Sequence, residues 1–269
     1  MPAYVCVTCG TQFPGSAASP DKCPICTDER QFVPRSGQAW TTLDAMRWIY
    51  RNSFRQYEPA LLGVGTIPEF GIRQRALLLR APAGNVLWDC ITFIDDATVS
   101  VIEALGGISA IAISHPHYYG AMVEWSHAFG KAPIYLHQCD RQWVMRPDPA
   151  IHFWSGDRLE LSADLTLINA GGHFEGGTVM HWRSGAAGRG ALLAGDILQV
   201  VPDFRWVSFM RSYPNYIPLR PAAVRRIVQR LAPFSFERVY GAWWDAVVPE
   251  DGKASVLRSA DRYVAAVTG

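Results

Sequence analysis

The chain has 269 residues, which fits one large domain with a small appendage. Its formal net charge is +1 and 18% of its residues are charged, so composition gives no electrostatic footprint for nucleic acid or an anionic membrane. No apolar run has the length of a membrane span, and the first twenty residues lack the basic start and apolar core of a secretory signal. We therefore expect a cytoplasmic protein without nucleic-acid or membrane partners, and its oligomeric state stays open.

Two Cys-x-x-Cys pairs stand near the N-terminus, and their members are Cys6, Cys9, Cys23 and Cys26. Two such pairs at this separation can bring four thiolates around one tetrahedral ion. Disulfides are the alternative, but a cytosolic chain disfavours them. The segment resembles a zinc ribbon and equally the rubredoxin-like module of rubrerythrins. Zinc is the predicted ion, with iron as the alternative.

The predicted module covers residues 1–38, which contain few large apolar side chains and many Gly, Pro, Ser and Asp. So small a unit buries too little surface to offset its ordering entropy, and metal binding supplies the missing stabilisation. We interpret the ion as a structural clip that packs on the main domain or shapes its site. A redox or partner-docking role is the alternative. Residues 39–64 form an aromatic-rich connector of open secondary structure, and 65–269 form the main domain.

The main domain mixes predicted strands with predicted helices. Strands are expected at 76–79, 85–89, 109–113, 133–136, 158–161, 165–168, 178–183 and 190–194. Helices are expected at 98–105, 119–129, 221–231 and 253–266, with a short one at 140–145. Mixed strands and helices, repeated in a second half, are typical of a layered α/β domain. Cys90 and Cys139 are expected to be small core residues.

Three short segments, each directly after a predicted strand, carry metal-ligating residues. They contain His115 with His117, then His173, then Asp196. Strand ends on a rigid scaffold hold ligands well, and neutral imidazoles with one carboxylate suit Zn²⁺ or Fe²⁺. On an extended segment, the two-residue period places the side chains of His115 and His117 on the same side. The sequence therefore predicts one metal site from these four residues.

In this order the segments resemble the metallo-β-lactamase superfamily. The family motif His-x-His-x-Asp-His corresponds to residues 115–120 of this chain. The family's Gly-His step corresponds to Gly172-His173, which Gly177-Thr178 follows, and its Gly-Asp step corresponds to Gly195-Asp196. The strands at 76–79 and 85–89 correspond to its opening hairpin. The resemblance covers roughly residues 65–265. It implies an α/β fold, the αββα metallo-β-lactamase sandwich, with the metal at one edge of the two sheets.

The chain departs from the family pattern at three places. Tyr119 stands where the family has an aspartate, Gly120 stands where it has a histidine, and residues 239–244 lack its last histidine. In two-metal members these three positions serve the second ion. His115, His117 and His173 match the ligands of the first ion, and Asp196 matches the bridging carboxylate. The resemblance therefore implies a single-metal site.

The predicted activity is metal-dependent hydrolysis of an unidentified small molecule. Three histidines hold zinc, while Asp196 orients or deprotonates the water. The family aspartate that aims the nucleophile is missing, so Asp196 or Tyr119 has to replace it. The Tyr119 hydroxyl either bonds the bound water or substrate, or its ring fills the vacant second site.

Two other functions stay open at this point. His115, His173 and Asp196 would also form a two-histidine, one-carboxylate site for Fe²⁺, similar to that of persulfide dioxygenases of the same superfamily. The second alternative is a non-catalytic binding protein with a relic site. His127, His137, His152 and His181 have no motif partner and are expected to be structural or exposed. The aromatic and arginine-rich segment 205–213 forms either a pocket wall or core packing.

Overall fold

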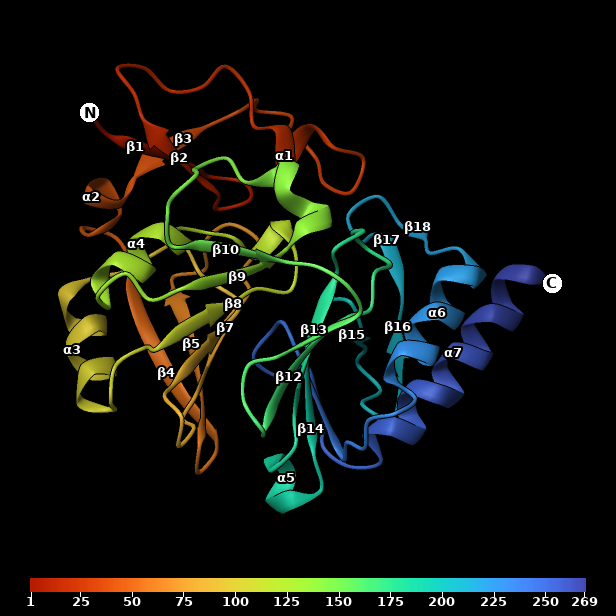
Figure 1. Ribbon diagram of the computed structural model, residues 1–269. Coiled ribbons are helices and arrows are strands. Elements are labelled where there is room, and N and C mark those ends of the chain that lie inside the picture. Colours follow the sequence, from red (N-terminus) through yellow and green to blue (C-terminus); the bar gives the residue numbers. More distant parts are fainter. The chain divides into compact units, whose positions relative to one another are not determined.

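The computed structural model describes all 269 residues, which divide into two compact units. Unit 1 comprises Met1–Leu136 and Arg141–Phe153, and unit 2 comprises His137–Asp140 and Trp154–Gly269. Figure 1 labels the helices and strands of both units. No helix combines the length and the apolar character needed to cross a membrane.

A three-stranded antiparallel sheet with the order β2-β1-β3 forms the N-terminal part of unit 1. Its strands are β1 (Ala3–Cys6), β2 (Gln12–Gly15) and β3 (Trp40–Thr42), and two short helices lie in the same segment, α1 (Pro24–Thr27) and α2 (Leu43–Met46). The ring of Trp40 packs edge-on against Phe13 at a centroid distance of 5.1 Å. The connector therefore contributes a strand and an aromatic ring to the fold of the cysteine-rich segment.

The main sheet of unit 1 has seven strands in the order β10-β9-β8-β7-β6-β5-β4. They are β4 (Arg51–Glu58), β5 (Leu61–Ile67), β6 (Ala76–Leu79), β7 (Val86–Trp88), β8 (Ala110–Ala112), β9 (Ile134–His137) and β10 (Ile151–Trp154). Strands β7, β8 and β9 pair in parallel. Every residue of β6 and β7 is buried, so these strands are continuous apolar runs in the sequence.

Capping side chains and glycines determine where the helices of unit 1 begin. They are α3 (Asp96–Ala104), the 3₁₀ turn η1 (Pro116–Tyr118), α4 (Met122–Ala128) and a second 3₁₀ turn, η2 (Gln138–Trp143), whose first residues belong to unit 2. Asp95 caps α3, because its carboxylate accepts a hydrogen bond of 2.8 Å from the Thr98 N–H. The single helix predicted at 119–129 is wrong at its start, since Gly120 has a φ of +49° and separates η1 from α4.

Unit 2 contains a six-stranded sheet in the order β11-β12-β13-β14-β19-β20. The strands are β11 (Arg158–Glu160), β12 (Leu165–Asn169), β13 (Thr178–Trp182), β14 (Ala191–Gly195), β19 (Arg238–Gly241) and β20 (Val247–Val248). The short helix α5 (Gly185–Gly188) and two small sheets complete it, β15 (Gln199–Val200) with β16 (Val207–Ser208) and β17 (Met210–Ser212) with β18 (Ile217–Pro218). Only β14 and β19 pair in parallel.

Two long helices, α6 (Pro221–Leu231) and α7 (Gly252–Thr268), cover one face of this sheet. They lie side by side, in blue, in Figure 1. Val224, Ile227 and Leu231 of α6 are buried in one core with Leu192 of β14 and Val256 of α7. The helical spacing of these α6 residues in the sequence therefore marks the face that packs on the sheet.

The two cysteines outside the N-terminal pairs differ in burial. Cys90 is fully buried, as expected for a small core residue, and its thiol donates to the Ile91 carbonyl oxygen. The same expectation is wrong for Cys139, which is exposed. Cys139 lies in η2 rather than in a strand or a packed helix, and a 3₁₀ turn leaves part of its side chains on the surface.

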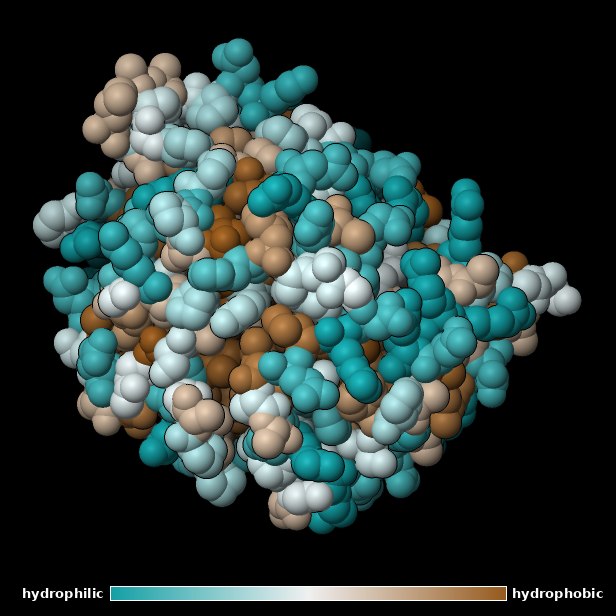
Figure 2. All heavy atoms as spheres, in the orientation of Figure 1, coloured by the Kyte–Doolittle hydropathy of each residue, from teal (hydrophilic) through white to brown (hydrophobic).

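Hydrophilic and hydrophobic side chains alternate on the face of the molecule that Figure 2 shows. Brown hydrophobic atoms show between teal ones over the region of β4 and β5 in this view. Strand β4 has only one buried residue, Glu58, because it is the last strand at one edge of the seven-stranded sheet. A surface mixed in this way is ordinary for a folded protein.

Candidate metal centres

The four cysteines of the N-terminal pairs come together in unit 1. Their sulfur atoms all lie within 4.8 Å of one another, and each side chain is at most 1% exposed. The Sγ atoms of Cys6 and Cys26, and those of Cys9 and Cys23, are 3.6 Å apart. A disulfide would need about 2.05 Å, and all six cysteines are free thiols. The predicted four-cysteine cluster is therefore present.

The cysteine cluster has the geometry that a tetrahedral ion requires. Bonds of about 2.3 Å from zinc to sulfur would place neighbouring sulfurs about 3.8 Å apart, close to the observed spacing. The Gln38 amide donates to the Cys6 sulfur at 3.1 Å, and hydrogen bonds from Cys23 and Cys26 hold the pKa of Cys6 well below its usual value. Both effects favour the thiolate form of Cys6, which is the form that binds metal, whereas hydrogen bonds within the cluster raise the pKa of Cys9 and that of Cys26.

His115 and His117 lie together in unit 1, just after β8. Their rings are 5.2 Å apart between centroids, and both side chains are buried. His115 has extended backbone angles and caps η1, whereas His117 is inside this 3₁₀ turn. The expectation that the pair lies on one extended segment is therefore wrong. Pro116, at the first position of the turn, suits the fixed φ of a proline.

A hydrogen-bonded chain supports His115 from the strand before it. The Asp89 carboxylate accepts a hydrogen bond of 2.7 Å from the Ser114 N–H, and the Ser114 hydroxyl lies 2.9 Å from Nδ1 of His115. Burial raises the pKa of Asp89 to about 7, although the bonds from Ser114 and the charge of Arg75 oppose this. With Nδ1 engaged, Nε2 is the nitrogen of His115 that would bind an ion.

His173 and Asp196 lie in unit 2, after β12 and β14. The Nδ1–H of His173 donates to the Met210 carbonyl oxygen at 3.2 Å. A carbonyl cannot donate, so this bond assigns the proton to Nδ1 and the lone pair to Nε2. The Asp140 carboxylate accepts a hydrogen bond of 2.9 Å from the Gly176 N–H, which fixes the loop after His173.

Tyr213 connects these two residues of unit 2. Its ring lies 5.6 Å from the His173 ring, and its hydroxyl donates to the backbone carbonyl oxygen of Asp196 at 2.6 Å. Burial, with the nearby charge of Asp196, raises the pKa of Tyr213 well above its usual value, so the phenol stays protonated. No motif in the sequence marks Tyr213 individually, although it belongs to the aromatic and arginine-rich segment 205–213.

Tyr119 is 2% exposed and follows η1 directly. It lines a small cavity in unit 1 with Thr11 and Gln12 of the cysteine-rich segment, Met122 and Val123 of α4, and Gly120, Met145 and Arg146. The ring of Tyr118, by contrast, packs edge-on against His115 at 4.4 Å between centroids. Asp89 and Tyr118 were not predicted as site residues, although Asp89 ends the hairpin that matched the family.

The remaining histidines have structural surroundings, as expected. His127 pairs with Asp148 at 3.0 Å on the surface, and His152 is exposed. His137 bonds the Gly156 carbonyl oxygen, and burial lowers its pKa. Within the segment 205–213, Phe209 is a core residue, as core packing predicts, and Arg205 pairs with Asp203 on the surface.

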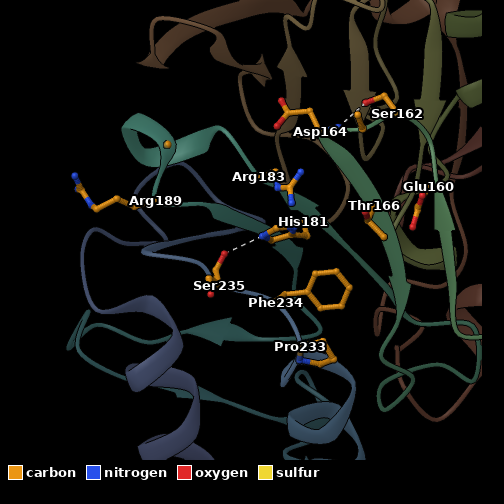
Figure 3. Close-up of a pocket in the computed structure, with 12 residues that line it drawn as sticks. Glu160, Ser162, Asp164, Thr166, His181, Arg183, Arg189, Pro233, Phe234 and Ser235 are labelled. Atoms are coloured by element: carbon orange, nitrogen blue, oxygen red, sulfur yellow. Dashed lines mark hydrogen bonds between the residues drawn. The ribbon is translucent and has the colours of Figure 1, made fainter.

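A cavity of about 650 Å³ lies within unit 2 at one end of its sheet. His181 of β13, Arg183 directly after this strand, Thr166 of β12 and Phe234 line it in Figure 3, where His181 donates to the Ser235 carbonyl oxygen at 2.8 Å. Burial lowers the pKa of His181. None of the predicted metal ligands lines this cavity, so it is separate from the candidate centres.

Comparison with solved structures defines the class of fold. DIM-1 metallo-β-lactamase matches with a TM-score of 0.58 at 11% identity, covering 80% of this chain and 98% of that one. A Cronobacter sakazakii metallo-β-lactamase with a HARLDQ motif matches with a TM-score of 0.54 at 18% identity, covering 84% and 95%. The chain therefore has the metallo-β-lactamase fold, which confirms the predicted fold class.

No protein-family model matches the chain. The protein YmaE of Bacillus subtilis (strain 168), described as uncharacterized, is 49% identical over 269 residues, which is 99% of this chain and 97% of that protein. The chain belongs to the same family as YmaE.

Proposed function

We propose that this protein is a metal-dependent hydrolase that binds one ion through His115, His117 and His173, with Asp196 beside it. The Nδ1–H bond of His173 to the Met210 carbonyl is the observation that carries the proposal, because it fixes the tautomer in which Nε2 is the ligand atom. The three histidines are all buried, and each offers one ring nitrogen.

The proposed ion is zinc, and iron is the alternative for the same donors. Imidazole nitrogens suit both metals, and the carboxylate of Asp196 suits iron as well as zinc. Three neutral imidazoles resemble catalytic zinc sites that keep a fourth position for water or substrate. An iron site would use His115, His173 and Asp196 instead, and the two sites differ in their need for His117.

The geometry of Gly120 supports a single ion. A Cβ atom built on Gly120 would lie 2.8 Å from the Ile91 carbonyl carbon, so any larger residue needs a backbone shift. The φ of +49° at this position also disfavours other residues. A histidine ligand at residue 120 is therefore incompatible with this local backbone, in agreement with the loss of the other two second-ion positions.

A bound ion would supply Lewis acidity, which acidifies water and polarises a carbonyl or phosphoryl oxygen. In this proposal Asp196 accepts the proton of the attacking water and returns it to the leaving group. Tyr213 holds the backbone of Asp196 through its 2.6 Å hydrogen bond to the carbonyl oxygen. Tyr119 is proposed as a second hydrogen-bonding group or as the residue that fills the second-ion position.

The remaining assignments are proposals of the same kind. The four-cysteine cluster is proposed to hold a structural zinc ion within residues 1–38, with 39–64 as connector and 65–269 as the catalytic domain. The proposed substrate is a small molecule, and the proposed compartment is the cytoplasm. No nucleic-acid or membrane partner is proposed, since the net charge is only +1.

Elemental analysis of the purified protein, followed by an anaerobic assay, tests this function. The assay panel contains esters, lactones, amides, thioesters and phosphodiesters. We expect turnover of at least one class that disappears in a His115→Ala, His173→Ala double variant and survives in His152→Ala, the matched control. If the wild type turned over no member of the panel and consumed oxygen with thiol or persulfide substrates, the dioxygenase would replace the hydrolase.

A further inference from the structure

The cysteine-rich segment lies directly against the residues that follow the histidine pair. The Gln12 N–H donates to the Gly120 carbonyl oxygen at 3.0 Å, and the Thr92 hydroxyl donates to the Gly10 carbonyl oxygen at 2.7 Å. Gln12 and Thr92 are each 4% exposed, and all four residues belong to unit 1. Two buried hydrogen bonds therefore join the loop after Cys9 to the main part of this unit.

The side chain of Gln12 adds a second anchor. Arg146 donates to the Gln12 carbonyl oxygen Oε1 and also to Glu124 of α4, at 2.6 Å for the carboxylate. The Gln12 amide donates to the same Glu124 oxygen at 3.4 Å. Gln12 thus binds the residues just before α4 through its backbone and α4 itself through its side chain.

The cysteine cluster fixes the position of this loop. The Cys6 N–H donates to the Thr11 carbonyl oxygen at 3.0 Å, and the Gly10 N–H donates to the Cys6 carbonyl oxygen at 2.8 Å. Trp143, Met145 and Ile72 pack against the cluster from the main part of the unit. An ion held by the four sulfurs would therefore set where Gln12 lies.

The 3₁₀ turn that contains His117 is short. His117 lies in a 3₁₀ turn of three residues, and the Tyr118 N–H bond to the His115 carbonyl oxygen is 3.1 Å long. So short a turn does not stabilise itself, because the cost of fixing the backbone is met by only one or two bonds. Contacts from outside the turn have to hold it, and the Gln12 bond to Gly120 is one of them.

We propose that Gln12 is a positioning residue for the metal site, and that the ion of the cysteine cluster acts at a distance by holding Gln12 against Gly120. This inference rests on the proposed function, because it assigns the cysteine module a role in the geometry of His115 and His117. The module is then part of the site's scaffold. Loss of the cysteine-bound ion loosens residues 115–122 even though none of them is a cysteine ligand.

Hydrogen exchange of the full-length protein tests the scaffold directly and does not require an ion at the histidine site. Cys23→Ser removes a ligand of the cluster, and Thr92→Val removes the donor to Gly10 while conserving shape. We expect the exchange rates of the backbone amides at residues 115–122 to rise about five- to tenfold in both variants. This rise corresponds to the loss of roughly one hydrogen bond. Ser16→Ala, whose hydroxyl bonds only the Ala18 carbonyl oxygen within the module, should leave these amides unchanged.

Titration with Co²⁺ provides the second readout. Thr92→Val and Gln12→Met should keep the cysteine cluster loaded and weaken Co²⁺ binding at the histidine site by about fivefold, the equivalent of roughly one hydrogen bond, seen in the visible ligand-field bands. In Cys23→Ser, loss of protection at residues 1–38 with β6 and β14 still protected would show that only the cysteine module has opened. Unchanged exchange at residues 115–122 in that protein would overturn the inference. If the wild type bound no Co²⁺ through its histidines, the proposed function would be refuted. The hydrogen-exchange experiment would still test whether the cysteine module holds residues 115–122 in place.

Discussion

The carboxylate of Asp89 accepts a 2.7 Å hydrogen bond from the backbone N–H of Ser114, the residue directly before His115. Asp89 has a φ of +58°, a left-handed conformation that aspartate tolerates better than most residues. Its side chain is 2% exposed, and the Ser114 hydroxyl continues the chain of contacts to Nδ1 of His115. Asp89 is therefore the buried acid that supports the segment of the proposed metal ligands His115 and His117.

The raised pKa of Asp89 predicts how stability depends on pH. Burial raises this pKa from 3.8 to about 7, so the folded state binds the Asp89 proton more tightly than the unfolded state does. The contribution of Asp89 to the unfolding free energy is therefore complete below about pH 4 and is lost as the pH rises to about 7. In Asp89→Asn the change in unfolding free energy across this pH range should be smaller by roughly 2–4 kcal/mol. The figure follows because a difference of one pKa unit corresponds to about 1.4 kcal/mol.

Urea unfolding of both proteins from about pH 4.5 to about pH 8, at matched metal content, measures the difference. Asp261→Asn is the control, since Asp261 is exposed on α7. A parallel pair of stability curves for wild type and Asp89→Asn would show that Asp89 stays ionised in the folded protein.

Metal content should reflect two separate centres. By ligand count the wild type should contain about two ions per chain, one at the cysteines and one at the histidines. A Cys6→Ser, Cys23→Ser double variant should lose one ion, and a His115→Ala, His173→Ala double variant should lose the other. Mass spectrometry of the metals, quantified per chain, gives both numbers. Two ions in the main domain alone would contradict the single-ion site.

The variant His117→Ala should distinguish hydrolysis from oxygen chemistry. A zinc site of three histidines loses a ligand and should lose more than about 100-fold in turnover, because the ion and its acidified water are lost together. An iron site of His115, His173 and Asp196 would retain iron and part of its turnover. Turnover under nitrogen and in air, after loading with Zn²⁺ or Fe²⁺, is the measurement. Retained turnover that needs air and Fe²⁺ would favour the dioxygenase.

Substitution of Gly120 should disturb the fold without restoring a second ion. Gly120→Ala places a Cβ 2.8 Å from the Ile91 carbonyl carbon at a φ of +49° and should cost about 1–3 kcal/mol of stability. Gly120→His should be at least as destabilising and should leave the metal content of the histidine site at one. Thermal unfolding and metal analysis test both variants, with Gly130→Ala, which has open space around it and a similarly positive φ, as the control. A second bound ion in Gly120→His would contradict the steric argument.

Removal of the Tyr213 hydroxyl should affect the site through Asp196. In Tyr213→Phe the 2.6 Å bond to the Asp196 carbonyl oxygen is lost, at a cost of about 1 kcal/mol or somewhat more for the orphaned acceptor. If Asp196 moves the proton, kcat should fall while KM changes little. Tyr263→Phe, whose hydroxyl donates to Leu219 elsewhere in unit 2, is the matched control. Equal losses in both variants would assign Tyr213 a purely structural role.

Local patterns in the sequence predict several of the elements and the chemistry of the ligands. Apolar runs such as Ala76–Leu79 and the helical spacing of Val224, Ile227 and Leu231 are local patterns, and the structure has a strand and a helix at those residues. The cysteine cluster was equally predictable, because two Cys-x-x-Cys pairs leave few arrangements other than one shared ion. These features depend on residues close together in the chain, so they can be predicted from the sequence.

The groups that support the ligands come from segments far apart in the sequence. Asp89 lies 25 residues before Ser114, Tyr213 lies 17 residues after Asp196, and Gln12 lies far from Gly120 in the sequence. The left-handed backbone of Asp89 and the 3₁₀ turn at His117 likewise have no periodic signal in the sequence. Such contacts arise from strand pairing and burial between distant segments, and residue spacing records neither of these.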